Sequence, residues 1–227
     1  MTKEKKFYTN LTYQDRQTKA KYVFDKHKTI LANTVLDVGA DAMYLKLDIE
    51  KNGGTYIGIG YGENIDYDVN LEQTPFNFSD DSFETVICLD VLEHLESIHA
   101  VFNELCRISK RNVIISLPNP WSDFFTVLLK GDYSKDQRLK FYGLPVRPPK
   151  DRHRWFFSEN EAIRFVSEIA DNNGFSITQF DTHDDKPMGG FGIRAKLGRL
   201  LLKSLFRPDI LELGLHHGTL WFVIEKR

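Results

Sequence analysis

The sequence has few cysteines, no excess of one charge and no long apolar run, and each absence narrows the class of protein. Among 227 residues there are two cysteines, Cys88 and Cys106, both in expected buried elements, so a reducing compartment is favoured over a disulfide framework. The formal net charge is −2, so the chain has no overall positive field that would attract nucleic acid or an anionic membrane. No stretch approaches the ~18 apolar residues of a transmembrane helix, and residues 1–6 are not followed by the apolar core of a secretory signal. These absences predict a soluble, cytoplasmic protein and do not favour nucleic acid as a partner.

The chain does contain an alternation of strand and helix patterns. Short apolar runs rich in β-branched residues predict strands at 34–39, 55–60, 66–71, 84–89, 112–117, 176–181 and 219–225. Helical spacing of apolar residues predicts helices at 13–31, 42–51, 92–109 and 159–173. Such alternation predicts an α/β fold with a mainly parallel sheet. We expect one domain over 34–227, preceded by an arm and a helix over 1–33.

Two later segments interrupt the alternation. Residues 121–157 are rich in aromatic residues, arginine, lysine and proline, which predicts a lid over the site. Its arginines favour a pocket for an anionic or sugar-bearing acceptor, although a solvated loop packed by its aromatic rings would have the same composition. Residues 193–206 form a basic amphipathic pattern, which suits either a helix on a membrane surface or half-buried cover.

Two predicted strand ends carry the residues best suited to a site. The first strand ends in Asp37 and Gly39, and the fourth ends in Asp90, with Glu93 and His94 just beyond it. In an open parallel sheet, ligands bind beyond the carboxyl ends of the strands. The sequence therefore predicts that cofactor and chemistry meet at this edge.

A long sequence motif around the fourth predicted strand supports a site at this edge of the sheet. The order of strands and helices, the turn after the first strand and the run from Asn70 to Phe83, followed by Val86 to His94, resemble class I S-adenosylmethionine-dependent methyltransferases of the type 11 kind. The likeness covers residues 34–120 well. It implies a Rossmann-like, seven-stranded, mostly parallel sheet of order 3-2-1-4-5-7-6 with an antiparallel last strand and helices on both faces, and S-adenosylmethionine as cofactor.

The resemblance also implies the cofactor-binding positions, which are Asp37, Gly39, Ala40, Asp41, Gly60, Tyr61, Asn70, Leu71, Leu89 and Asp90. Here the chain departs from the family pattern in two ways. Asp41 and Met43 replace two glycines of the first loop, and Gly60 stands where the family places an acid for the ribose, so Tyr61 or Glu63 is expected to substitute. These departures favour a second hypothesis, a binding protein that keeps the fold without turnover.

The residues after the fourth strand admit three chemical hypotheses. Asp90, Glu93 and His94 have the i, i+3, i+4 spacing of one helix face. With His153 they resemble the divalent metal sites of O-methyltransferases of the small-RNA and ubiquinone-pathway kinds. Alternatively, His94 or His153 is a general base for an acceptor hydroxyl, or Glu93 and His94 only orient the helix start. We predict His94, Glu93 and His153 as the catalytic residues, with a divalent metal possible but not favoured.

The predicted activity is therefore transfer of a methyl group to an acceptor oxygen. A sugar hydroxyl in a surface glycan or glycolipid, as in polysaccharide biosynthesis, is the first expectation for the acceptor. A quinone-like small molecule is the second and RNA the third. Peripheral contact with a membrane remains open in this interpretation.

Overall fold

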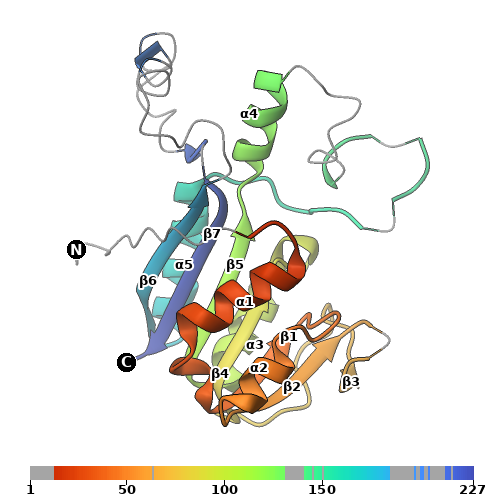
Figure 1. Ribbon diagram of the computed structural model, residues 1–227, viewed down its shortest axis with the longest axis vertical. Coiled ribbons are helices and arrows are strands. Elements are labelled where there is room, and N and C mark those ends of the chain that lie inside the picture. The colour runs from red at the N-terminus through yellow and green to blue at the C-terminus, as the bar shows by residue number, and fades with distance from the viewer. Residues whose placement is uncertain are drawn as a thin grey trace.

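The computed structural model describes residues 13–62, 64–130, 141–144, 146–149, 151–184, 197, 200, 201, 204, 213–215 and 217–227. They form a seven-stranded sheet of order β3-β2-β1-β4-β5-β7-β6 (Figure 1). Strand β7 runs antiparallel to both of its neighbours, whereas the other pairs are parallel. The predicted fold class, strand order and antiparallel last strand are confirmed.

The strands are short and apolar at the centre of the sheet. Their bounds are β1 Thr34–Val38, β2 Thr55–Gly60, β3 Tyr67–Asp68, β4 Phe83–Leu89, β5 Ser109–Pro118, β6 Phe175–Asp184 and β7 His217–Lys226. In β4, successive residues such as Val86 and Ile87 are both fully buried, because helices cover both faces of a parallel sheet.

The helices and 3-10 turns are α1 Arg16–His27, η1 Ile30–Ala32, α2 Lys46–Lys51, η2 Leu92–His94, α3 Ile98–Ile108, α4 Pro120–Lys130 and α5 Glu159–Asn172. Capping boxes begin two of them. Asp15 exchanges hydrogen bonds with Thr18 at the start of α1, and Ser158 does so with Glu161 at the start of α5, which satisfies backbone groups that helix ends leave free.

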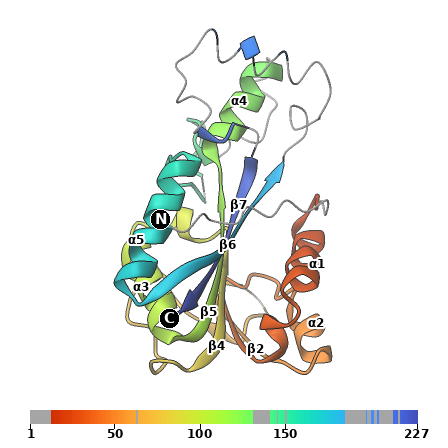
Figure 2. The ribbon, with the colours of Figure 1, turned by 90° about the vertical axis from the view of Figure 1, so that its left-hand side faces the viewer.

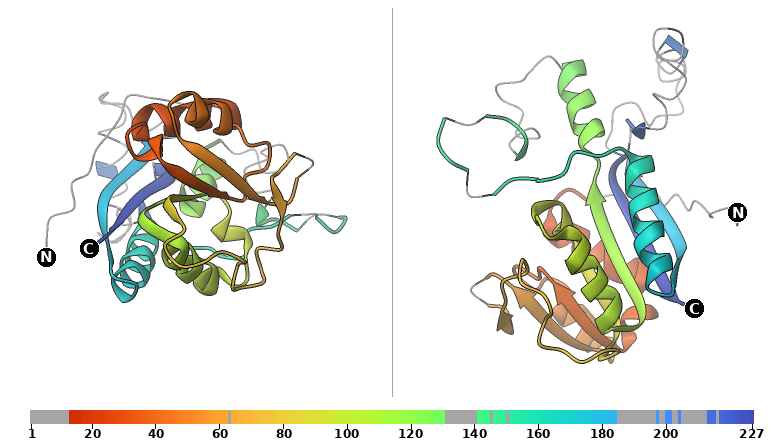
Figure 3. Two further views of the ribbon diagram at one scale, coloured as in Figure 1. Left: turned by 90° about the horizontal axis from the view of Figure 1, so that it is seen from below. Right: turned by 180° about the vertical axis from the view of Figure 1, so that it is seen from behind.

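Two cores lie on opposite faces of the sheet. Val86 and Cys88 of β4 belong to one cluster and Ile87 to the other, as the alternation of side chains along a strand requires. Figure 2 shows α1 and α2 on one side of the sheet and α3 and α5 on the other, and the right panel of Figure 3 shows α3 and α5 across the far face. The carboxyl ends of β1 and β4 remain free to form a site.

The single helix expected over 92–109 is wrong. Leu95 has an extended backbone, with φ −94° and ψ 133°, and it separates the turn η2 from helix α3. Asp90 has φ +53°, which is outside the helical region. Asp90, Glu93 and His94 therefore do not share one helix face, and their placement depends on the turn.

The later segments are only partly described. Helix α4 occupies the start of the predicted lid, and residues 131–140 lie outside the described residues, as does most of the helix expected over 193–206. Within the described ranges, no helix has both the length and the apolar character needed to cross a membrane.

Candidate active site

A cavity of about 870 Å³ opens at the carboxyl ends of β1 and β4. Its lining includes nine of the ten predicted cofactor residues, namely Asp37, Gly39, Ala40, Asp41, Tyr61, Asn70, Leu71, Leu89 and Asp90. Glu93, His94 and His153 line the same cavity. Gly60 is not part of its lining. The cavity thus brings both predicted strand ends and the distant His153 together.

The first turn requires a glycine at its start. Gly39 has φ +83°, and a Cβ there would lie 2.2 Å from Val91 Cγ2. The amides of Gly39 and Ala40 both donate to the Ile59 carbonyl, at 2.8 and 3.1 Å. The turn is therefore held tightly between the ends of β2 and β4, and only glycine fits this approach.

The two departures from the family pattern do not close the cavity. Gly60 has φ +136°, and a Cβ there would lie 3.2 Å from Gly39 Cα, so the end of β2 passes close to the first turn. Met43 packs against the core cluster beneath α1 and α2 and does not line the cavity. Tyr61 follows Gly60, is 63% exposed and lines the cavity, whereas Glu63 lies outside the described residues.

Asp37 is a buried carboxyl group at the base of the cavity. It is 6% exposed and accepts a hydrogen bond of 2.6 Å from the Tyr56 hydroxyl. Burial raises the pKa of Asp37 to about 7 despite this hydrogen bond, because the charged form is poorly solvated there.

This shift predicts a pH-dependent stability. The folded protein holds the Asp37 proton more tightly than the unfolded chain, so the free energy of unfolding should fall as the pH rises from about 4 to about 7. The Asp37→Asn variant lacks this proton and keeps an oxygen for Tyr56. Relative to wild type, it should gain on the order of 2–4 kcal/mol across this window and no more above it, measured by urea unfolding without ligand. Asp68→Asn, at an exposed acid, is the control, and parallel curves for Asp37→Asn and wild type would refute the prediction.

The turn after β4 is held by a lysine from another element. Asp90 pairs with Lys19 of α1 and accepts a 2.7 Å hydrogen bond from Ser116 Oγ. Burial would raise the pKa of Asp90, but the charge and hydrogen bonds of Lys19 and Ser116 hold it below its usual value. Lys19 lies in the helix expected over 13–31, and sequence reasoning missed it as a site residue. No local motif signals that its side chain reaches β4.

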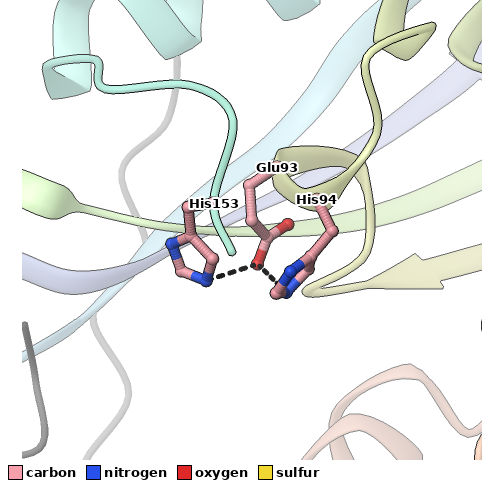
Figure 4. A group of neighbouring side chains, drawn as sticks. All are labelled: Glu93, His94 and His153. Carbon is pink, nitrogen blue, oxygen red and sulfur yellow. Dashed lines mark ion pairs between the residues drawn. The ribbon is translucent and has the colours of Figure 1, made fainter. Parts of the chain in front are cut away.

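Glu93, His94 and His153 form what we call the His–Glu–His cluster. Figure 4 shows the Glu93 carboxylate between the two imidazole rings. Glu93 Oε1 lies 3.7 Å from His94 Nε2 and 3.9 Å from His153 Nε2. Burial, and then the charge of Asp90, raises the pKa of Glu93 well above its usual value. Asp90, expected as a fourth member, is instead engaged by Lys19 and Ser116.

The other nitrogen of each imidazole lies close to a polar side chain. His94 Nδ1 lies 2.6 Å from Asp151 Oδ1, and His153 Nδ1 lies 2.6 Å from the Tyr142 hydroxyl. The Phe141 ring stacks on His153 with ring centroids 4.2 Å apart. The Tyr142 hydrogen bond fixes the direction of the His153 ring, whereas His94 Nδ1 makes no hydrogen bond within the described residues, and both Nε2 atoms face Glu93. For the side chains that contact the two imidazoles, the only sequence signal was the aromatic content of the predicted lid.

Backbone contacts tie the lid segment to the turn η2. The Arg154 amide donates to the Glu93 carbonyl at 2.8 Å, and Trp155 Nε1 donates to the Leu95 carbonyl at 2.7 Å. These two bonds bring His153 to the cluster although it lies far from Glu93 in the sequence.

The lid arginines have other partners. Arg152 donates to the carbonyls of Tyr142 and Gly143, and Arg154 pairs with Glu96. None of the lid arginines that the structure describes lines the cavity. The expected arginine pocket for an anionic acceptor is therefore not formed by these residues.

Comparison with protein families agrees with this geometry. A family model described as a methyltransferase domain matches residues 14–180, a range that includes helix α1, the cavity and the His–Glu–His cluster. Among curated proteins, no sequence relative matches the chain.

Solved structures share the architecture. The magnesium protoporphyrin IX methyltransferase of Synechocystis PCC 6803 with bound SAH is 16% identical, with a TM-score of 0.55 over 93% of this chain and 83% of that one. A SAM-dependent methyltransferase from Archaeoglobus fulgidus is 14% identical, with a TM-score of 0.59 over 92% and 94%. A small RNA methyltransferase is 14% identical, with a TM-score of 0.59 over 96% of this chain and 26% of that one. At these identities the likeness shows a common fold.

Proposed function

We propose, from the premise that this chain belongs to the methyltransferase domain family, that it transfers the methyl group of S-adenosylmethionine (SAM) to an acceptor hydroxyl. The observation that carries the proposal is the single cavity that joins the glycine turn after β1 to the His–Glu–His cluster after β4. SAM supplies, when bound, a methyl group activated by the positive charge of its sulfonium.

The residues present fit such a cofactor. The turn at Gly39 lets backbone approach a ligand without a Cβ, and neither Met43 nor Gly60 obstructs the cavity. We propose that Asp37, Gly39, Ala40, Asp41 and Leu89 hold the amino-acid side of the cofactor and that Tyr61, Asn70 and Leu71 hold the adenosine side. Gly60 acts only by letting Tyr61 reach the cavity.

The His–Glu–His cluster is suited to removing the acceptor proton. His94 lines the cavity, its Nε2 lies 3.7 Å from Glu93 Oε1, and the Asp151 carboxylate lies 2.6 Å from its Nδ1. We therefore propose His94 as the general base, with Glu93 and His153 positioning the acceptor and the ring.

A second candidate is a metal-assisted version of the same reaction. One carboxylate oxygen of Glu93, Oε2, has no hydrogen-bond partner among the described residues although Glu93 is 1% exposed. The ligand atoms of Glu93, His94 and His153 lie within 4.8 Å of one another. Nitrogen and carboxylate donors suit ions such as Zn²⁺ or Mn²⁺, and such an ion would lower the pKa of a bound hydroxyl.

Removal of metal separates the two candidates. For the general base, methyl transfer should be unchanged after dialysis against EDTA, and the purified protein should contain no stoichiometric metal. A loss of turnover that added Zn²⁺, Mn²⁺ or Mg²⁺ reverses would instead assign Glu93, His94 and His153 as ligands. Elemental analysis of the purified protein provides a readout that does not depend on activity.

The acceptor is proposed to be a sugar hydroxyl of a glycan or glycolipid. The described wall near the cluster contains Asp123, Asp151 and the Phe141 ring. Carboxylates accept hydrogen bonds from hydroxyl groups and repel anions, whereas an aromatic face packs against the apolar side of a ring. These features support a neutral acceptor over an anionic one such as RNA. A quinone-like small molecule is the alternative acceptor.

The location of the protein is proposed to be cytoplasmic. The free, buried cysteines Cys88 and Cys106 support this proposal, because free thiols suit a reducing compartment.

Binding and turnover test the proposal in sequence. Micromolar binding of S-adenosylhomocysteine (SAH) in calorimetry is expected, followed by transfer of labelled methyl from SAM to members of a panel of neutral glycans, quinols and RNA. Binding without transfer to any acceptor would favour a non-catalytic protein with this fold. Absence of binding up to millimolar SAH would overturn the proposed function.

A further inference from the structure

Exposed aliphatic side chains gather at one end of the molecule. The part of the chain that the structure describes exposes seven leucine and valine side chains, and of these Leu47 alone lies outside residues 128–201. The other six are Leu128, Leu144, Val146, Leu197, Leu200 and Leu201. Figure 1 shows α4 and the described parts of 141–149 and 197–204 beyond the carboxyl ends of β4 and β5. Single exposed leucines are common on protein surfaces, whereas several at one end indicate an interaction site.

The most exposed of these side chains belong to the lid segment. Leu144 is 99% exposed and Val146 is fully exposed, so neither side chain is covered by other described residues. Arg147 follows them, is also exposed and does not line the cavity. We call Leu144, Val146 and Arg147 the lid tip. The lid tip presents two apolar groups and one cation to the solvent.

The sequence around the lid tip is basic, although the whole chain is not. Residues 138–154 contain six lysines and arginines and one acid, and residues 193–206 contain four and none, in a chain with a formal net charge of −2. Arg152 donates to the carbonyls of Tyr142 and Gly143, which carry no charge to neutralise it. The local charge is therefore opposite in sign to that of the chain as a whole.

We propose that this end of the protein binds the surface of an anionic lipid bilayer. Leu144 and Val146 enter the headgroup region, and Arg147 lies at the lipid phosphates. The strength of such binding depends on the apolar area that is buried and on the attraction of cations to anionic lipids, and the lid tip provides both. The inference goes beyond the proposed function, because binding to lipid does not depend on the reaction that follows.

The shape of the lid tip favours a bilayer over a protein partner. A protein interface needs complementary surfaces that pack as densely as a protein interior. Side chains as exposed as Leu144 and Val146 form no groove or flat patch among the described residues. A fluid bilayer has no fixed shape and closes around protruding side chains. Basic charge supplies the second signal that membrane binding needs when the apolar contribution is small.

The lid tip lies close to the cavity. Phe141 lines the cavity and stacks on His153, and Leu144 is three residues further along the chain. Three residues of extended chain span at most ~11 Å, so a bilayer bound at the lid tip lies beside the acceptor side of the cavity. An acceptor anchored in that bilayer can enter the cavity without leaving the lipid surface, which suits a glycolipid.

Vesicle flotation tests the inference on the whole chain, without cofactor or acceptor. Vesicles of phosphatidylcholine alone are compared with vesicles that contain about 30% phosphatidylglycerol, and the anionic vesicles should bind at least about tenfold more strongly, because several basic residues contribute. Raising NaCl from about 0.15 M to about 0.5 M should weaken this binding, because salt screens the attraction.

Two variants separate apolar insertion from charge. The double variant Leu144→Ser with Val146→Ser should weaken binding to the anionic vesicles about tenfold or more, because two apolar groups no longer enter the bilayer. Arg147→Gln should weaken it about fivefold. Leu47→Ser, at the exposed leucine of α2, is the matched control and should bind like wild type. All of these variants should keep the urea unfolding curve of wild type, because the replaced side chains are exposed.

Failure of wild type to bind the anionic vesicles would overturn the inference, as would unchanged binding by the double variant or by Arg147→Gln. Light scattering without lipid tests the other occupant of this surface. If wild type is a dimer and the double variant is a monomer, a second copy of the chain covers the lid tip and the inference is wrong. None of these measurements uses SAH, so a protein that binds vesicles but not SAH would contradict the proposed function alone.

Discussion

Replacing His94 with alanine should lower kcat by about 10²–10⁴-fold while the affinity for SAH stays within a few-fold of wild type. The imidazole lies beside Asp151 and faces the cavity, so its removal takes away the proposed proton acceptor, and a positioned general base contributes a factor of this size. Single-turnover methyl transfer and SAH calorimetry measure the two effects separately.

Two further variants make this result specific. Asp151→Asn should reduce kcat by a smaller factor, because it leaves the His94 imidazole in place and removes only the carboxylate that lies 2.6 Å from its Nδ1. His99→Ala, at an exposed histidine of α3 outside the cavity lining, should be close to wild type. The assignment of His94 as base is wrong if His94→Ala retains more than a tenth of the wild-type kcat at the optimal acceptor concentration.

Replacing Gly39 with alanine should both destabilise the protein and abolish tight SAH binding. The new Cβ would lie 2.2 Å from Val91 Cγ2, at a residue with φ +83°. Backbone strain and overpacking together cost about 2–4 kcal/mol, and relief of the clash must move the turn that borders the cofactor cavity. Urea unfolding and SAH calorimetry provide the two readouts.

The chain offers a matched control for the backbone strain alone. Gly53 has φ +88°, but a Cβ there meets no atom within 4 Å, so Gly53→Ala should lose only about 1–2 kcal/mol and bind SAH normally. Adding Val91→Ala to Gly39→Ala should recover part of the stability. Equal destabilisation by the two glycine variants would show that the contact with Val91 does not control the turn.

The order of the elements was predictable from the sequence, because the burial of each element determines the spacing of its apolar residues. Apolar runs such as that of β4 and the helical spacing along α3 reflect which side chains face a core, and strand–helix alternation restricts the topology to a few arrangements. The capping box of Ser158 and Glu161 was also predictable, because both partners lie within one turn of chain. The boundaries of α2 and of the helix after β4 were not, because the positive φ angles at Asp41, Met43 and Asp90 are imposed by packing.

Contacts between side chains of distant elements have no comparable pattern in the sequence. The spacing of Asp90, Glu93 and His94 predicted one shared surface. In the folded protein, Asp90 instead contacts Lys19 and Ser116, and His153 lies beside Glu93. Likewise, the arginines of the lid were visible in the sequence, whereas their hydrogen bonds to nearby backbone carbonyls were not.

The sequence by itself therefore determined the fold, the edge of the sheet where the cavity lies and twelve of the residues that line it. Only the tertiary structure decided that Met43 lies outside the cavity, that α1 supplies two cations to it and that Asp151 and Tyr142 lie beside the two histidines. The physical reason is the range of the interactions. The spacing of apolar residues within one helix or strand shows which of its sides is buried. The partner of a charged or polar side chain depends instead on how separate elements pack together.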